Sequence, residues 1–364
     1  MFFLLAALVL LGTHLATVGL YLWRLHTPPV GRGIIGTPPI TLLRPVCGLD
    51  AYDAETLESS FVQDYPDYEI IFCAPSATDA AMPLVRRLMA AHPERRAQLL
   101  VGQVARTGNP KLNNLWKGWQ AAAHDWVCMT DSNLLLPPDY LTTLVAAWGP
   151  DTGVVSAPPV GSRPDGIGGH LECAFLNSNQ ARWQFAAGSL GTAFAQGKTL
   201  FWNKPMVDGA GGLAILGRHL AEDVSATKLV RSLGLRVSLP PRPFAQPIGW
   251  RSLRQVWDRQ LRWSRVRRDG FFWLFFGEFT NGAAVGAVLM ALAGGPLAVM
   301  AYLALWWGAE VVLMMRAGWP HGWRDVAVLP LRDALLPALW AATFLRRGFE
   351  WRGTAMTTAD VPAT

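Results

Sequence analysis

The chain has 364 residues, of which 51% are hydrophobic and only 16% are charged. Because soluble globular chains carry about 25% charged residues, this composition excludes a disordered protein and argues against a freely soluble enzyme. The net charge of +6 favours an anionic partner, which leaves a membrane surface, a phosphorylated ligand and a nucleic acid as alternatives.

The first feature along the chain is an apolar segment over residues 2–23 that contains no Asp, Glu, Lys or Arg. As a helix, this segment is long enough to span the ~30 Å hydrocarbon core of a membrane. The positive charge follows the segment, at Arg24, His26 and Arg32, whereas a cleaved signal peptide carries it in front. We therefore predict a transmembrane anchor over residues 1–24, with the body of the protein facing the cytoplasm.

Residues 38–250 have the pattern of an α/β domain. Apolar runs of strand length alternate with helix-length patterns, the strands at 40–43, 68–74, 98–104 and 126–130 and the helices at 54–62, 80–91, 112–122 and 140–148. This alternation predicts a parallel sheet with helices on both faces. Ligands of such sheets bind beyond the carboxyl ends of the strands, so we expect the functional residues just after each apolar run.

Lys111 lies in the segment 109–114, NPKLNN, at the start of a predicted helix. The helix dipole disfavours a cation at this end unless an anion is near. This conflict favours a phosphate-facing role for Lys111 over a plain turn, and Asn109 and Asn113 are candidate cap or turn residues.

Asp131, Ser132 and Asn133 directly follow the predicted strand at 126–130. A carboxylate at a strand end, with a second oxygen ligand two residues on, can hold a hard divalent cation that bridges diphosphate oxygens. The spacing is equally compatible with an Asx or Ser turn that opens the next loop. Asp131 and Asn133 are therefore candidate metal ligands.

Glu222 and Asp223 form an acidic pair after the Gly-rich stretch 208–212. Adjacent carboxylates repel each other, so we expect one of them to have a perturbed pKa or a cationic partner. Such a group suits a general base near neutral pH. The alternative is the acidic first turn of a helix over 223–233.

Residues 259–268 contain five arginines, interleaved with Trp263. Arg259 and Arg262 are three residues apart and share one helix face, and arginine is suited to bidentate pyrophosphate binding. A juxtamembrane basic helix attracted to anionic lipid is the alternative, and both can hold at once. We assign residues 251–280 to an interfacial segment.

The last predicted region, residues 281–350, is a set of membrane helices. It contains apolar runs with a break at 294–296, GGP, and the charged residue Glu310 stands within one of these runs. An unpaired charge is costly in a membrane, so Glu310 is expected to face protein or water. We predict two spanning helices with interfacial or re-entrant pieces, and three or four helices are the alternatives.

The order of these features resembles the ceramide glucosyltransferases, which are membrane-bound inverting glycosyltransferases of family 21 with the GT-A fold. The family pattern is three spaced aspartates followed by (Q/R)xxRW. The resemblance covers nearly the whole chain, and its closest stretches are LRPVCG at 43–48, QDYP at 63–66, GNPKLNN at 108–114, AED at 221–223 and RQLRW at 259–263. It implies an α/β, GT-A-like nucleotide-sugar-binding domain between membrane helices, of the bacterial type.

The resemblance also implies residue roles. Asp79 would lie near the nucleotide, Asp131 would hold the metal and diphosphate, and Asp223 would be the catalytic base. The predicted donor-binding residues are Asp79, Lys111, Asp131 and Arg259, and the predicted catalytic residues are Asp223, Arg262 and Trp263. Where related enzymes have Asp-x-Asp, this sequence has Asp131-Ser132-Asn133, so a Mg²⁺ or Mn²⁺ ion would rest on Asp131 with one neutral partner.

The implied function is transfer of glucose from UDP-glucose to the primary hydroxyl of ceramide with inversion, in glycosphingolipid biosynthesis. Diacylglycerol, a hopanoid or a polyprenyl phosphate as acceptor, and a processive reaction, are alternatives within the same chemistry. A non-catalytic membrane protein is a remote alternative, and no nucleic acid is expected. The basic charge and short loops favour a bacterial inner membrane, with the catalytic domain in the cytoplasm.

Overall fold

The computed structural model describes residues 1–26, 33–219, 221–345, 349–351 and 354–356. Arg32, which contributed to the predicted orientation, lies outside these ranges. The chain forms two compact units, which we describe separately. The sheet unit comprises Pro28–Pro159, Gly191–Pro247 and Glu350–Thr364, and the helical unit comprises Met1–Thr27, Val160–Leu190 and Ile248–Phe349.

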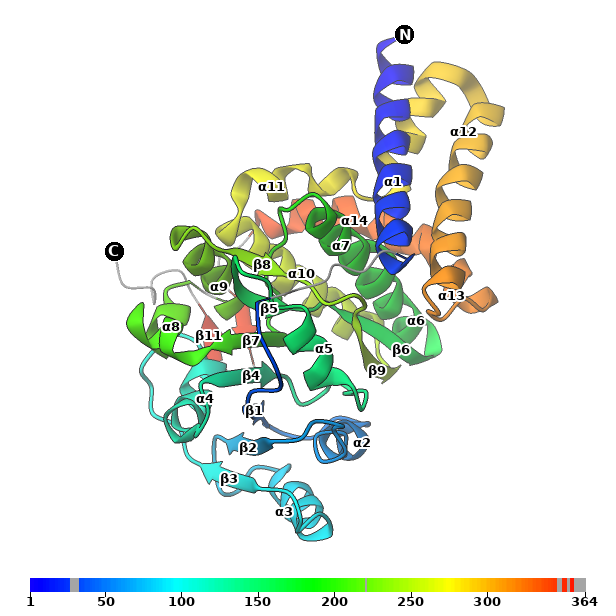
Figure 1. Cartoon of the computed structure of the whole chain (residues 1–364). Helices are drawn as coiled ribbons and strands as arrows, with labels where there is room; N and C mark the ends of the chain where they lie inside the picture. The colour runs from blue at the N-terminus through cyan, green and yellow to red at the C-terminus, as the bar shows by residue number, and fades with distance from the viewer. Residues whose placement is uncertain (27–32, 220, 346–348, 352–353, 357–364) are drawn as a thin grey trace. The chain divides into compact units, whose positions relative to one another are not determined.

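The sheet unit is built on a seven-stranded sheet of the order β3-β2-β1-β4-β7-β5-β8 within the described residues (Figure 1). Its strands are β1 (Ile40–Pro45), β2 (Tyr68–Ala74), β3 (Ala97–Val101), β4 (Trp126–Thr130), β5 (Thr152–Ser156), β7 (Thr199–Asn203) and β8 (Arg236–Ser238). β1 to β4 pair in parallel, as the sequence pattern predicts. β7 is antiparallel to β4 and to β5, which the expectation of a parallel sheet did not include.

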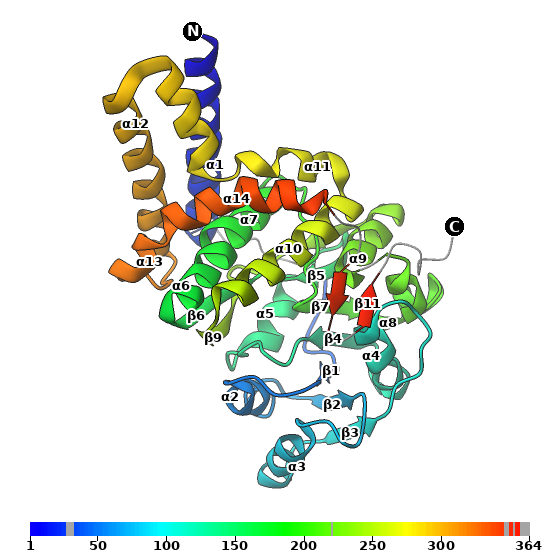
Figure 2. The same cartoon turned by 180° about the vertical axis from the view of Figure 1, so that it is seen from behind.

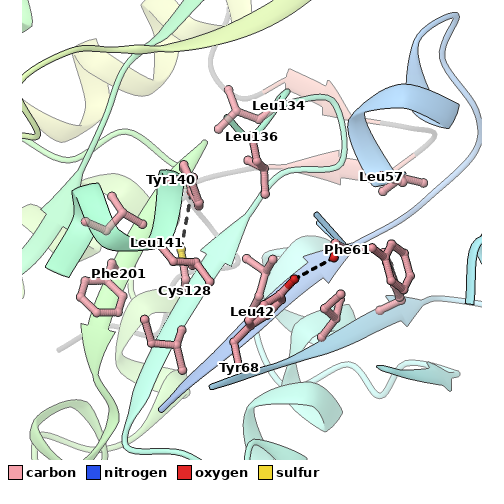
Figure 3. Packing of buried hydrophobic residues seen from close by; sticks show 14 of the residues in the cluster. Leu42, Leu57, Phe61, Tyr68, Cys128, Leu134, Leu136, Tyr140, Leu141 and Phe201 are labelled. Atoms are coloured by element: carbon pink, nitrogen blue, oxygen red, sulfur yellow. Dashed lines mark hydrogen bonds between the residues drawn. The ribbon is translucent and has the colours of Figure 1, made fainter. Parts of the chain in front are cut away.

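Three of the four predicted strands, β1, β2 and β4, are largely buried on both faces, as central parallel strands are, whereas β3 lies at the edge of the sheet and is partly exposed. All seven residues of β2 are buried. Figure 3 shows the core on one side of the sheet, where Leu42, Cys128 and Phe201 from three strands pack together. β3 ends at Val101 rather than at the predicted residue 104, because Gly102 turns the chain with a φ of 96°.

The helices of the sheet unit alternate with these strands along the sequence. They are α2 (Asp53–Glu58), α3 (Met82–Ala91), α4 (Pro110–Ala121), α5 (Tyr140–Ala146), α8 (Lys204–Gly209), η2 (Leu213–Gly217) and α9 (Glu222–Ser232). The predicted helix at 112–122 begins two residues earlier, at Pro110, because the Asn109 side chain accepts hydrogen bonds from the backbone N–H groups of Lys111 and Leu112. A proline at the first helical position and an asparagine cap are both favourable.

The helical unit carries the apolar ends of the chain. Its helices are α1 (Phe2–His26), α6 (Gly166–Ala174), η1 (Phe175–Ala181), α7 (Arg182–Ser189), α10 (Leu253–Gly270), α11 (Phe272–Phe276), η3 (Gly277–Thr280), α12 (Ala283–Arg316), α13 (Trp323–Ala327) and α14 (Leu329–Thr343). Two further pairs of strands, β6 (Pro159–Asp165) with β9 (Phe244–Trp250) and β10 (Phe349–Trp351) with β11 (Thr354–Met356), form small sheets.

Among the described residues, three helical segments are long and apolar enough to cross a membrane: Phe2–His26, Ala283–Arg316 and Trp323–Thr343. The second of them is not one straight helix. Gly295 has a φ of 75° and Pro296 follows it, so the helix breaks at the predicted position. Figures 1 and 2 show the two arms of α12 folding back on each other beside α1.

The charge that the sequence placed in this apolar region is paired inside the protein. Glu310 is fully buried, and its Oε1 lies 2.8 Å from Arg332 on α14. Arg332 also contacts its neighbour Asp333 at 2.5 Å. The expectation that Glu310 faces protein or water is therefore confirmed, because a buried guanidinium serves as its partner.

Substitution of this buried group gives a test of the packing. Loss of one member of a buried ion pair costs about 3–5 kcal/mol. We expect Arg332→Met, which removes the cation shared by Glu310 and Asp333, to lower the melting temperature of the detergent-solubilised protein more than Glu310→Gln, which leaves Arg332 paired with Asp333. The exposed Arg324 supplies the control, since Arg324→Met should melt like the wild type. Equal melting of Arg332→Met and wild type would contradict the assignment.

Candidate active site

The candidate site in the sheet unit lies where β4 ends. β1, β2 and β4 are parallel, so the loops that follow them meet at one edge of the sheet. The antiparallel strand β7 begins at this same edge, and Thr130 of β4 pairs with Thr199 of β7. One residue beyond this pair, the backbone N–H of Asp131 donates to the carbonyl of Lys198 at 3.2 Å. Asp131 and Lys198 are thus neighbours across two strands.

Lys111, at the start of α4, is the centre of the site. Its Nζ lies 2.5 Å from Asp131 Oδ1 and 2.7 Å from Glu222 Oε1, and it donates to the carbonyl of Gly197 at 2.7 Å. The other Glu222 oxygen accepts a hydrogen bond from Asn109 Nδ2 at 2.8 Å. The cation that conflicted with the helix dipole therefore has two carboxylate partners, and Asn109 both caps α4 and holds Glu222.

Lys198 completes the cluster from the other side. Its Nζ lies 2.9 Å from Asp131 Oδ2 and donates to Asn133 Oδ1 at 2.8 Å. Each Asp131 oxygen thus faces one lysine. Burial alone would raise the pKa of Asp131, but the two ammonium groups outweigh it and hold that pKa well below its usual value. Burial would likewise lower the pKa of Lys111, whereas Asp131 and Glu222 raise it.

Asp223 differs from its neighbour Glu222. Its Oδ2 accepts from the backbone N–H of Gly197 at 3.2 Å, and its Oδ1 accepts from Val224 N–H at 2.8 Å. Burial and the negative charge of Glu222 raise the pKa of Asp223 to about 7, against the opposing effect of these hydrogen bonds and of Lys111. The acidic pair therefore contains one carboxylate in ion pairs and one that changes protonation near neutral pH.

Asp79 has backbone partners. Both of its carboxylate oxygens accept from Gly48 N–H at 3.0 Å, and Oδ1 also accepts from Ala81 N–H at 2.9 Å. These bonds join the loop after β1 to the start of α3. In the part of the chain that the structure describes, the hydrogen bonds of Asp79 do not connect it with Lys111 or Asp131.

The arginine segment lies on α10 in the helical unit, whereas Asp131 and Asp223 belong to the sheet unit. Arg259 NH1 lies 3.1 Å from the buried Glu172 of α6, and its guanidinium lies 4.6 Å from the centre of the Trp263 ring. Gln260 donates to the same Glu172 at 3.3 Å. Arg262 and Trp263 are partly buried on the same helix. Glu172 thus fixes the leading part of the RxxRW sequence.

Three residues of the sheet-unit cluster and of its support have roles that the sequence alone does not predict. The sequence pattern predicts no strand at 199–203. The antiparallel pairing of that strand, β7, with β4 brings Lys198 to Asp131. Glu222 was noted as half of an acidic pair, without the assignment to Lys111. Arg44 is fully buried and donates to the carbonyls of Ser132 and Leu134 at 3.2 and 3.3 Å, which supports the loop after Asp131. An arginine inside an otherwise apolar strand was the available signal for it.

The chemistry of Asp131 and Asn133 fits a hard divalent cation, since both offer oxygen donors. Among the described residues, no group of three or more His, Cys, Asp or Glu side chains is placed to hold a metal ion. A cation here would therefore take the rest of its ligands from a bound diphosphate or water, which is usual for Mg²⁺. Both protein ligands are in contact with the Lys198 ammonium in this structure.

Comparison with solved structures identifies the fold class. The chain is similar to the structure described as mannosyltransferase PcManGT from Pyrobaculum calidifontis in complex with GDP-Man and Mn2+, with a TM-score of 0.55 and 19% sequence identity over 94% of this chain and 98% of that one. The sheet and its helices therefore form a GT-A-like fold, accompanied by long apolar helices at both ends of the sequence.

Sequence comparison identifies the family. Glycosyl transferase family 21 matches residues 4–362, and the chain belongs to this family. It is 27% identical over 232 residues to ceramide glucosyltransferase 1 of Caenorhabditis elegans, covering 63% of this chain and 50% of that protein. It is 26% identical over 299 residues to the ceramide glucosyltransferase of Komagataella phaffii, covering 65% of this chain and 59% of that protein. The chain thus spans about half the length of the relatives it matches.

The link between Asn109 and Glu222 can be tested by comparing two helix caps. Asn109 caps α4 and also holds Glu222, whereas Asn203 caps α8 through Met206 N–H alone. Loss of an asparagine cap costs about 0.5–2 kcal/mol, and a hydrogen bond to a charged group contributes about 1.5–3 kcal/mol. We therefore expect Asn109→Ala to lower the melting temperature clearly more than Asn203→Ala. Equal shifts would show that the Glu222 contact adds nothing.

Proposed function

We propose that the chain is an inverting glucosyltransferase that transfers glucose from UDP-glucose to the primary hydroxyl of ceramide. The observation that carries the proposal is the pairing of a carboxyl group at Asp223, with a pKa of about 7, with the two-lysine cluster around Asp131. The first supplies a base, and the second places two ammonium groups where they can interact with a diphosphate. Membership of family 21 and the similarity to proteins named ceramide glucosyltransferases support the choice of donor and acceptor.

In the proposed reaction, Asp223 accepts the proton of the acceptor hydroxyl while that oxygen attacks the anomeric carbon of the sugar. The bond between this carbon and the diphosphate oxygen breaks, and UDP leaves with the electron pair. A single displacement inverts the configuration at the anomeric carbon. Lys111 lies at the strand-end cluster where it can neutralise the charge that grows on the leaving diphosphate.

The remaining predicted residues have proposed roles in the same reaction. Asp131 and Asn133 would hold a divalent cation, which would supply further positive charge to the leaving group. We propose that Asp79 contributes to nucleotide binding. Arg259, Arg262 and Trp263 are proposed to act on the diphosphate and the acceptor, as the RxxRW pattern of the family implies.

The lipid acceptor is consistent with the three apolar helical segments. We propose residues 1–24 as an anchor, 38–250 as a cytoplasmic transferase domain, 251–280 as an interfacial segment and 281–350 as membrane helices. The exposed aromatic residues of α11, Phe272 and Trp273 among them, support the interfacial assignment, because aromatic side chains favour the boundary between lipid and water. A bacterial inner membrane is the proposed location.

The acceptor is tested by offering the purified full chain UDP-glucose and Mn²⁺ with ceramide and diacylglycerol in separate lipid nanodiscs. We expect glucosylceramide as the product, identified by mass and by its β configuration. Glucosyl-diacylglycerol as the product would replace ceramide by another lipid and retain the transfer chemistry, and products with two sugars would indicate a processive reaction. Absence of transfer to every lipid and from every sugar nucleotide would contradict the enzymatic proposal.

The base is tested by Asp223→Asn, which keeps the size of the side chain and removes its basicity. General base catalysis contributes about 10²- to 10⁴-fold, so we expect kcat to fall by that factor while UDP-glucose binding, measured by calorimetry, is retained. Asp139→Asn is the matched control, because Asp139 forms a half-exposed ion pair with Arg242. Near-normal kcat for Asp223→Asn would rule out Asp223 as the base.

The raised pKa of Asp223 gives a pH prediction. The base must be ionised, and the folded-state pKa is about 7, so activity is present above that pH and falls about tenfold per pH unit below it. Glu222 is the second cause of the raised pKa, after burial. Glu222→Gln should therefore move the acidic limb of the kcat/KM profile, which reports the free enzyme, to lower pH. An unchanged or upward-shifted limb would contradict the electrostatic coupling of the two residues.

A further inference from the structure

We propose that Lys198 and a divalent cation compete for the same place between Asp131 and Asn133, so that Lys198 sets how tightly this chain binds the cation. The identification of this place as part of a donor site rests on the proposed function. The competition itself concerns only the binding of a metal ion to the protein, and it is tested without sugar nucleotide or lipid.

The backbone holds Lys198 at this place. Residue 199 is the first residue of β7 and pairs with Thr130, the last residue of β4. The next hydrogen bond, from Asp131 N–H to the Lys198 carbonyl, fixes the two residues side by side. Only 13% of the Lys198 side chain is exposed, so the ammonium group is largely removed from water.

The contacts of the ammonium group are those that a metal ion would need. Lys198 Nζ lies 2.9 Å from Asp131 Oδ2 and 2.8 Å from Asn133 Oδ1. A Mg²⁺ ion binds its oxygen ligands at about 2.0–2.1 Å. An ion that bridged the same two oxygens would occupy the space of the ammonium group, so the two cations exclude each other sterically.

The charge balance leads to the same conclusion. The contacts of the cluster involve two ammonium groups, from Lys111 and Lys198, and two carboxylates, from Asp131 and Glu222. These charges cancel while Asp223 is protonated. Addition of a divalent ion with both lysines in place would leave two uncompensated positive charges in a largely buried site, which is costly. Displacement of Lys198 from Asp131 relieves part of this cost.

Lys111 is less suited to the role of competitor. Its ammonium group contacts the other Asp131 oxygen, and it is also held by Glu222 and by the Gly197 carbonyl. Among the described residues, the ion pairs and hydrogen bonds of the Lys111 ammonium group do not include Asn133, whereas Lys198 contacts both candidate ligands. Lys198 is therefore the residue whose removal opens the pair of oxygens.

The test measures Mn²⁺ binding to the detergent-solubilised full chain by electron paramagnetic resonance of the free ion, with no nucleotide or lipid substrate. We expect Lys198→Met to bind Mn²⁺ at least about tenfold more tightly than the wild type, since a neighbouring positive charge is removed and the space becomes available. Lys198→Gln, a polar variant, should show the same direction. Lys198→Arg keeps the charge and should bind as weakly as the wild type.

Two controls separate competition from general effects of charge. Lys204→Met removes a lysine at the far end of β7, where it pairs with Asp208 at 2.7 Å, and should leave Mn²⁺ binding unchanged. Asp131→Asn combined with Lys198→Met should abolish the gain.

Equal Mn²⁺ affinities for the wild type, Lys198→Met and Lys198→Gln would overturn the proposal, and so would a gain that survives Asp131→Asn. The glucosyl-transfer assay is independent of these measurements, so failure of the proposed function is seen there and failure of the competition is seen here.

Discussion

The ammonium group of Lys111 joins three segments that lie far apart in the sequence. It contacts Asp131 after β4, Glu222 at the start of α9 and the Gly197 carbonyl before β7. Without it, two carboxylates would face each other in a mostly buried place, where an unpaired charge is costly. Lys111 therefore ties the start of α9 to the loop after β4, while the backbone pairing of β4 with β7 already holds the entry to β7 beside that loop.

The same ion pair gives the two members of the acidic pair different properties. Glu222 is held by Lys111 and Asn109, and its negative charge then acts on its neighbour. Among the described residues, the hydrogen bonds to the Asp223 carboxyl group come from backbone N–H groups, and burial and the charge of Glu222 raise its pKa to about 7. Asp223, with a pKa near neutral pH, and Asp131, with a lowered pKa, thus occur in one cluster because their charged neighbours differ.

The helical unit also contains buried charged residues, here within apolar helices. Glu310 on α12 and Asp333 on α14 share the guanidinium of Arg332, so each of these carboxylates has a cationic partner within the protein. Glu172 does the same for Arg259 beneath the RxxRW sequence. The partners of Glu310 and Arg259 lie on other helices, whereas Asp333 pairs with its neighbour on α14.

Local pattern determined much of this protein. The apolar runs at 68–74 and 126–130 became strands with those bounds, the N-terminal apolar segment became one long helix, and the Gly295-Pro296 break in α12 followed from backbone chemistry alone. The candidate residues Lys111, Asp131, Asn133 and Asp223 were recognisable because they follow strands or begin helices.

Tertiary structure decided the rest: the direction of β7, the arrival of Lys198 beside Asp131, and the choice of Glu222 rather than Asp223 as the partner of Lys111. These contacts join residues 67 to 111 positions apart, and sequence periodicity carries information about the face of an element but none about which distant element will pack against it.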